Sequence, residues 1–260
     1  MIKPGFKQGY ADVIKSFISF RVNEAKAKGV VIGLSGGLDS AVTTKMCVEA
    51  LGKEKVFCFL LPTENTPKED TEDALEFAKS LGVKYRIIDI SGIVKKIAST
   101  IHNKMKKKEM GNIHARTRMI VLYYFANKNN YLVVGSGNKT EILMGYFTKY
   151  GDGACDIMPL GDLYKTQVRE LAKHLKIPEK IINKTPRAGL WKGQTDESEL
   201  GIKYEILDQI LYGMEKGLKN NEIGESAGVK ISEVKRIKNI VNSTKHKRKM
   251  PEMARIEQQS

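Results

Sequence analysis

The segment from residue 31 to residue 51 constrains the fold more than any other part of this chain. An apolar run stops at Ser35-Gly36-Gly37-Leu38-Asp39-Ser40, and a helix-compatible stretch follows as far as Leu51. Glycines in such a turn can adopt backbone angles closed to other residues, so successive N–H groups can converge on an anion. The following helix N-terminus adds the positive end of its dipole. The pattern therefore predicts a strand, a phosphate-binding loop and a helix, in that order.

Asp39 separates this loop from commoner phosphate-binding motifs. A Walker A loop would need Gly at position 38 and Lys at position 39, and no G-x-G-x-x-G is present here either. A carboxylate beside phosphate charges is repelled unless a divalent cation lies between them, so Asp39 is predicted to bind Mg²⁺. An unliganded Gly-Gly turn would not explain Ser35, Asp39 and Ser40 together. The loop resembles the SGGxDS loop of the ATP pyrophosphatases, which split ATP between its α- and β-phosphates.

Composition indicates an ordinary intracellular chain. The 260 residues, 41% of them hydrophobic, can bury the core of one large domain. No apolar stretch approaches the roughly 20 residues of a membrane span, and the N-terminus lacks a signal peptide's apolar segment. Three widely spaced cysteines, Cys47, Cys58 and Cys155, support neither a disulfide framework nor a zinc site. We therefore expect a soluble, cytoplasmic protein with no membrane partner.

The net charge of +14 leaves three explanations open. It fits a nucleic-acid partner, a site for ATP and a second phosphate-rich substrate, or a lysine-rich surface of the thermophile kind. Charge alone does not choose among them.

Hydrophobic periodicity predicts an α/β fold. Helices are expected at residues 10–29, 39–51, 66–81, 93–107 and 113–127, and strands at the apolar run before Ser35 and at 55–61, 83–90 and 131–134. The third helix opens with Thr66-Pro67-Lys68-Glu69, which reads as a capping box. Strands that alternate with helices imply a parallel sheet covered on both faces, with ligands at the carboxyl ends of the strands.

Three loops at such ends carry polar side chains, at residues 35–40, 61–66 and 135–141. In the last of them, Ser136 and the glycine amides could meet a nucleotide. Glu141 could supply a second carboxylate to the cation held by Asp39, since two carboxylates with phosphate oxygens make a typical Mg²⁺ shell.

Four further motifs follow in order: Asn112-Ile-His-Ala-Arg-Thr-Arg-Met119, Phe147 to Lys165, Gly193-Gln-Thr-Asp-Glu197, and His246-Lys-Arg-Lys-Met-Pro251. The first of these opens a helix in this interpretation. Its two arginines diverge by about 200° around a helix, so one could bind ligand while the other braces the fold. Together with the phosphate loop and Gly135-Ser-Gly-Asn-Lys-Thr-Glu141, these motifs resemble the ammonia-dependent NAD⁺ synthetases along most of the chain.

The resemblance implies an adenine-nucleotide α-hydrolase-like (Rossmann-like) fold and the ATP-dependent amidation of deamido-NAD through an acyl adenylate, with release of AMP and pyrophosphate. It implies a single domain over 1–260. This domain would comprise an N-terminal helix (1–29), a nucleotide-binding core (30–160) and a mostly helical part (161–260) that ends in a basic lid (245–251).

The resemblance also implies roles for individual residues. ATP would contact Gly33, Leu34, Ser35, Gly36, Gly37, Leu38, Asp39, Ser40, Ser136, Lys165 and the region of Arg187. Mg²⁺ would be held by Asp39 and Glu141, which with Lys165 form the catalytic set. Deamido-NAD would contact Arg116, Lys149, Asp156, His246 and Lys247.

Arg187 departs from the family pattern. Relatives carry a hydroxyl residue in a Pro-[Ser/Thr]-Ala segment, where this chain has Pro186-Arg187-Ala188. Arg187 could replace that hydroxyl with a charge-assisted bond to ATP or point away, and the sequence leaves both open.

The resemblance further implies a homodimer with substrate sites near the subunit interface. The synthetase motifs occupy the 260 residues and leave no room for an amidase domain. Free ammonia, or ammonia from a separate partner, is therefore the expected nitrogen source.

The sequence is also compatible with purely structural roles for some residues and with two other classes of function. Cys155 lacks an activating partner and is taken as structural. Trp191 is expected to fill the core or a subunit interface rather than to stack on a base, and a dinucleotide substrate keeps stacking open as the alternative. A tRNA-modifying enzyme of the same superfamily would use the positive charge, but its usual C-x-x-C is absent. Residues 221–242 followed by the basic run 245–249 could form a helix-turn-helix, although such hairpins are frequent without DNA. We rank a nucleic-acid partner below the enzyme.

Overall fold

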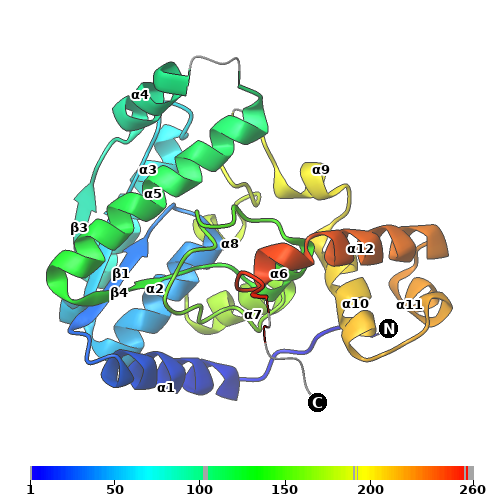
Figure 1. Cartoon of the computed structure of the whole chain (residues 1–260). Coiled ribbons are helices and arrows are strands. Elements are labelled where there is room, and N and C mark those ends of the chain that lie inside the picture. The colour runs from blue at the N-terminus through cyan, green and yellow to red at the C-terminus, as the bar shows by residue number, and fades with distance from the viewer. Residues whose placement is uncertain (1, 102–104, 190, 192, 255, 257–260) are drawn as a thin grey trace.

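A four-stranded parallel sheet organises the protein, whose computed structural model describes residues 2–101, 105–189, 191, 193–254 and 256. The strand order is β3-β2-β1-β4, with helices on both faces (Figure 1). The strands are β1 (Gly29–Gly33), β2 (Val56–Leu60), β3 (Lys84–Ile87) and β4 (Tyr131–Val134). The chain winds outward from β1 to β3 and then returns to place β4 on the other side of β1. The predicted α/β fold with a parallel sheet is confirmed.

Helices connect and cover the strands. Before β4 they are α1 (Gly9–Glu24), α2 (Leu38–Leu51), η1 (Lys53–Lys55), α3 (Lys68–Leu81), α4 (Ser91–Ile101) and α5 (Lys107–Asn129). After β4 they are α6 (Lys139–Met144), α7 (Lys165–His174), α8 (Glu179–Ile182), α9 (Asp196–Leu200), α10 (Tyr204–Glu215), α11 (Asn220–Ala227), α12 (Ile231–Ser243) and η2 (Lys245–Arg248). None of the helices in the described ranges is long and apolar enough to cross a bilayer.

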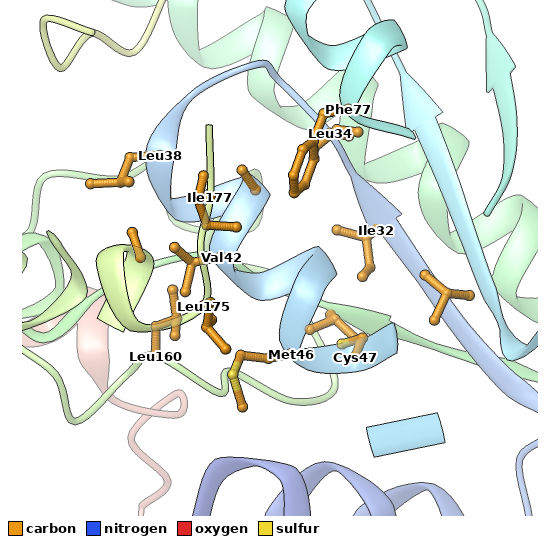
Figure 2. Packing of buried hydrophobic residues seen from close by; sticks show 14 of the residues in the cluster. Ile32, Leu34, Leu38, Val42, Met46, Cys47, Phe77, Leu160, Leu175 and Ile177 are labelled. Atoms are coloured by element: carbon orange, nitrogen blue, oxygen red, sulfur yellow. The ribbon is translucent and has the colours of Figure 1, made fainter. Parts of the chain in front are cut away.

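Side chains alternate between the two faces of the sheet, as β geometry requires. On β1, Val30 and Ile32 pack into a cluster formed with α1, α2, α7 and α8. Figure 2 shows Ile32 on the strand side of α2 and Val42 on the other side of this helix, toward Leu175 and Ile177. Val31 faces the other way, into a cluster with Phe59 of β2 and residues of α4 and α5. Since β1 is buried on both faces, its sequence is a continuous apolar run.

A second core joins the carboxyl-terminal helices. Tyr204, Leu207 and Ile210 of α10 are fully buried against Ile223 of α11 and Ile237 of α12. Met144 of α6 and Tyr164, which precedes α7, belong to the same cluster. The helical part is thereby packed onto the two helices that follow β4.

Two local predictions were wrong. Helix α3 begins after Pro67, and the Thr66 hydroxyl accepts from the Thr63 backbone N–H at 2.9 Å, so it closes a turn and does not cap the helix. Helix α5 begins at Lys107, where the Glu109 carboxylate accepts from the Lys106 N–H at 2.8 Å. The two arginines of the 112–119 motif therefore lie in the middle of this helix and not at its start.

Candidate active site

The loops after β1 and β4 lie side by side because these strands are neighbours, with Ile32 paired to Val134. The strand order reverses between β1 and β4, because β2 and β3 lie on one side of β1 and β4 lies on the other, which makes the carboxyl ends of β1 and β4 a topological switch point. Ligands of open α/β sheets bind at such points. The predicted phosphate loop and the predicted second carboxylate therefore meet at the expected place.

The loop after β1 has the conformation of an anion cradle. Gly36 has φ of +80°, a left-handed angle that favours glycine. The Ser35 and Ser40 hydroxyls lie 3.0 Å apart, and Ser40 Oγ also donates to the Gly37 carbonyl at 3.0 Å. Helix α2 starts at Leu38, directly after Gly37, so its free N–H groups point to the same region.

The loop after β4 aims Glu141 at Asp39. Asn138 caps α6 by accepting from the Glu141 N–H at 3.0 Å, and the Glu141 carboxylate accepts from the Asn138 N–H at 3.2 Å. The Asn138 side-chain amide donates to Asp39 Oδ1 at 3.0 Å. The fully buried Asn138 side chain therefore holds both carboxylates: it binds Asp39 directly and positions Glu141 through the helix cap.

Lys165 lies between the two carboxylates. Its ammonium donates to Asp39 Oδ2 and lies 3.5 Å from Glu141 Oε1. The side chain is only 3% exposed. It enters from the start of α7, where the Lys165 backbone N–H donates to the Thr140 hydroxyl at 3.0 Å. Buried Asp208 of α10 accepts from the Thr140 hydroxyl and from the Thr166 N–H, so the helical part of the chain positions Lys165.

The charges in this group are unequal. Burial would lower the pKa of Lys165, but the Asp39 and Glu141 carboxylates outweigh it and raise that pKa. Burial, and then the charge of Asp39, raises the pKa of Glu141 to about 8. One ammonium thus faces two carboxylates, and the group favours additional positive charge.

The carboxylate oxygens of Asp39 and Glu141 suit a hard cation such as Mg²⁺. Within the described part of the chain, no cluster of three or more His, Cys, Asp or Glu side chains could hold a metal by itself. A cation at this place would therefore take its remaining ligands from substrate oxygens.

A cavity of about 530 Å³ opens over this group, a size typical of small-molecule sites. Its lining contains the predicted ATP residues Gly33, Leu34, Ser35, Gly37, Leu38, Asp39, Ser40, Ser136, Lys165 and Arg187 and the predicted metal ligand Glu141. Gly36 is not in the lining, since its Cα faces Asp70: a Cβ there would lie 2.1 Å from the Asp70 carbonyl oxygen.

The residues expected to bind deamido-NAD lie mostly beside this cavity. Lys247 lines it, and its ammonium donates to the Gly145 carbonyl at 2.5 Å. Arg116 donates to the Lys149 carbonyl at 3.2 Å, and the Lys149 ammonium donates to the His246 carbonyl at 2.8 Å. The exposed Arg116 and His246 are thus joined through Lys149 in one chain of contacts next to the cavity.

Asp156 takes no part in the hydrogen bonds that join Arg116, Lys149 and His246. Its carboxylate accepts from the Val133 N–H at 2.7 Å and from the Tyr123 hydroxyl at 3.2 Å. Asp156 is nevertheless exposed and does not line the cavity.

Several lining residues were missed by sequence reasoning. Arg118 lines the cavity and donates to the Leu61 carbonyl at 3.1 Å, while Arg116 points outward on the same helix. Asp196 also lines it and accepts from the Tyr204 hydroxyl at 3.0 Å, and burial raises the pKa of Asp196. The Gly193-Gln-Thr-Asp-Glu197 motif was the only sequence signal for Asp196. The divergence of about 200° between Arg116 and Arg118 around a helix could not say which of the two faces the cavity.

Trp191 and Cys155 were predicted to be structural. Trp191 lines the cavity and does not fill the core. The Cys155 thiol fits its prediction, because burial raises its pKa to about 11 and leaves it protonated at neutral pH.

Known proteins of one family are similar to this chain over most of its length. The family model described as NAD synthase matches residues 10–251. The "NH(3)-dependent NAD(+) synthetase" of Methanocaldococcus jannaschii is 48% identical over 241 residues, which cover 92% of this chain and 93% of the relative. Neither alternative from the sequence, a tRNA-modifying enzyme or a DNA-binding hairpin, is favoured by these matches.

Two solved structures are similar over nearly their whole length. The "NMN synthetase from Francisella tularensis" has a TM-score of 0.86 at 36% identity and covers 96% of this chain and 99% of that one. The "NH3-dependent NAD synthetase from Campylobacter jejuni" has a TM-score of 0.81 at 35% identity, with coverage of 95% and 99%.

Proposed function

This chain belongs to the NAD synthase family, and from that premise we propose how its residues carry out the amidation of deamido-NAD to NAD⁺. The enzyme is a ligase that uses ATP and ammonia. The nicotinate carboxylate attacks the α-phosphorus of ATP, which forms an acyl adenylate and releases pyrophosphate. Ammonia then attacks the acyl carbon, and AMP leaves.

The position of Lys165 carries the assignment of the ATP site. A buried ammonium beside Asp39, at the end of a glycine-rich loop and a helix N-terminus, is placed to meet the charge that develops on departing pyrophosphate. In this proposal the loop N–H groups and the Ser35 and Ser40 hydroxyls hold the phosphates. Catalysis then consists of positioning and charge stabilisation and needs no covalent enzyme intermediate.

We assign Mg²⁺ to Asp39 and Glu141. The excess negative charge of this pair, the oxygen donors and the raised pKa of Glu141 all support a cation there. When bound, the ion would neutralise phosphate charge and polarise the α-phosphate. Lys165 would keep its contact with Asp39 or turn toward the phosphates as they arrive.

For deamido-NAD, the chain formed by Arg116, Lys149 and His246 with neighbouring Lys247 offers positive charge beside the cavity. Residues 245–251 would act as a lid, because η2 is tied to the α6 end by Lys247 and by Arg248, which donates to the Leu143 carbonyl at 2.7 Å. Such a lid would exclude water from a hydrolysable adenylate.

A homodimer is supported by apolar side chains that the single chain leaves exposed. Ile120 and Tyr124 of α5 are each 58% exposed, and they lie on one stripe with Arg116, at spacings of four residues. Ile87 of the edge strand β3 and Ile93 of neighbouring α4 are each 46% exposed. A second subunit packed on this stripe would also reach Arg116, which would place the deamido-NAD contacts near the interface.

Ammonia is the proposed nitrogen donor for the chain acting alone. Glutamine amidases use an activated thiolate, whereas burial raises the pKa of Cys58 to about 12 and that of Cys155 to about 11. A cytoplasmic location is also proposed, since the described cysteines are free thiols and the substrates are metabolites of the cell interior.

The decisive test is incubation with ATP, Mg²⁺, ammonium and a choice of two acids. Deamido-NAD is compared with nicotinate mononucleotide, whose amidation would give NMN, the product named for the Francisella tularensis relative. We expect NAD⁺, AMP and pyrophosphate from deamido-NAD at the higher kcat/KM. Formation of ADP and phosphate would refute the mechanism, and preference for the mononucleotide would refute the substrate.

A further inference from the structure

A group of buried charges joins helix α3 to residues 184–189 at the edge of the cavity. Asp70 and Asp73 lie one turn apart on α3, and each side chain is 10% exposed. The Lys184 ammonium, also 10% exposed, donates to both carboxylates, at 3.0 Å to Asp70. Arg187 donates to both oxygens of Asp70, from Nη2 at 2.7 Å and from Nε at 3.2 Å.

Asp70 therefore touches two parts of the ATP site at once. Its backbone carbonyl packs directly on Gly36 of the phosphate loop, and its side chain binds the segment that carries Arg187. The far side of the same segment is tied down by the Pro186 carbonyl, which accepts from the Asp196 N–H at 3.0 Å. Residues 184–189 line the cavity between these two attachments.

We propose that Asp70 is a positioning residue for ATP, which holds residues 184–189 against the phosphate loop through Lys184 and Arg187. This rests on the proposed assignment of the loop to ATP. Arg187 acts through Asp70 and stays paired with it when ATP binds. Two of the five guanidinium N–H groups of Arg187 are bound by an Asp70 side chain that is itself only 10% exposed, in the fork geometry that carboxylates match well.

The competing role for Arg187, direct contact with the phosphates, makes an opposite prediction. If Asp70 positions the segment, then Asp70→Asn and Arg187→Gln should each weaken ATP binding by roughly tenfold, and the double variant should be no weaker than the worse single variant. If Arg187 binds phosphate, Arg187→Gln still weakens binding, but Asp70→Asn releases the guanidinium and leaves the affinity unchanged or higher. The sign of the Asp70→Asn effect separates the two.

Binding is measured by calorimetry with α,β-methylene-ATP, so no turnover is needed. Trypsin provides a second readout, because the bonds after Lys184 and Arg187 become accessible when the segment detaches. We expect Asp70→Asn to be cut there several times faster than the unmodified protein, as mass spectrometry of the fragments would show. If Asp70→Asn fails to fold, Arg187→Gln takes its place, because the Arg187 side chain is 29% exposed and its replacement disturbs the core less. This variant should likewise be cut faster after Lys184.

Glu233→Gln is the matched control. Glu233 also binds an arginine with two bonds, from Arg236 Nε at 2.9 Å and Nη2 at 2.6 Å, but on α12 and outside the cavity lining. The Glu233→Gln variant should bind α,β-methylene-ATP with the affinity of the unmodified protein and be cut by trypsin after Lys184 and Arg187 at the same rate. Unchanged or tighter binding by Asp70→Asn, or unchanged cleavage, would overturn the proposal. Absence of NAD⁺ synthesis with the expected binding and cleavage would instead count against the proposed function.

Discussion

Replacing Glu141 with glutamine should make the nucleotide-free protein more stable at alkaline pH while impairing its function. Asp39 and Glu141 share one ammonium, that of Lys165, so one negative charge is in excess in a site where the two carboxylates are 16% and 17% exposed. Glutamine preserves the size of the side chain and removes that charge. Lys165 keeps its bond to Asp39.

The magnitude follows from the pKa of Glu141, which burial and then Asp39 raise from 4.5 to about 8. A tenfold change in proton affinity corresponds to about 1.4 kcal/mol, so ionising Glu141 in the folded state would cost at most about 5 kcal/mol. Partial exposure and relaxation reduce this, and we expect about 2 kcal/mol. For a chain of this size, that is a difference of roughly 4–8 °C in Tm.

The pH dependence has a definite sign. The folded state holds the Glu141 proton more tightly than the unfolded state, so its contribution is fully present below pH 4.5 and is lost as the pH rises to about 8. Glutamine at this position does not titrate. The two proteins should therefore have similar Tm near pH 4.5, and the variant should gain steadily up to pH 8 and hold a constant advantage above it.

The assay is thermal unfolding between pH 4.5 and pH 9 in EDTA, repeated at pH 8 with Mg²⁺ and α,β-methylene-ATP. Ligand should raise the Tm of the unmodified protein well above its Tm in EDTA and that of Glu141→Gln much less. Parallel Tm curves in EDTA, or a variant that is less stable at pH 9, would refute the argument that Glu141 carries the excess charge.

Four further outcomes follow from the site. Asp39→Asn should lower turnover on the order of 10²-fold without loss of helix content by circular dichroism, because it removes a ligand charge at constant volume; normal turnover at limiting Mg²⁺ would contradict this. Ammonium should support NAD⁺ synthesis with a rate that rises with pH as NH₃ replaces NH₄⁺, whereas glutamine should give none, and robust glutamine-dependent synthesis by the pure chain would disprove it. Truncation before Lys245, or His246→Ala with Lys247→Ala, should raise the KM for deamido-NAD about tenfold and lower kcat, with less effect on ATP; unchanged kinetics in both would make the segment an ordinary tail. Tyr124→Asp should shift the protein toward monomer in analytical ultracentrifugation, and an unmodified protein that is already monomeric would rule out the dimer.

The sequence by itself determined the elements that form locally. A strand that is buried on both faces of a sheet needs a continuous apolar run, and this made β1 and β2 visible in the chain. The edge strand β4 was visible as a shorter apolar run, of which the last two residues are buried. The phosphate loop was equally plain, because Gly36 and the residues around it must satisfy a local backbone requirement. Motif order then identified the family, which the comparisons confirmed, together with its reaction.

The tertiary structure decided which charges meet. Lys165 is 126 positions from Asp39 in sequence, and the two meet where Asp208 of α10 holds the start of α7 against α6. The choice between Arg116 and Arg118 likewise depended on the rotation of α5 against the sheet, which its whole 23-residue length sets and the motif alone does not. Asp70 carried no motif, since its partners Lys184 and Arg187 lie more than a hundred positions away. Contacts at such separations depend on how helices pack, and packing is a property of the complete core, so a local pattern of residues cannot contain it.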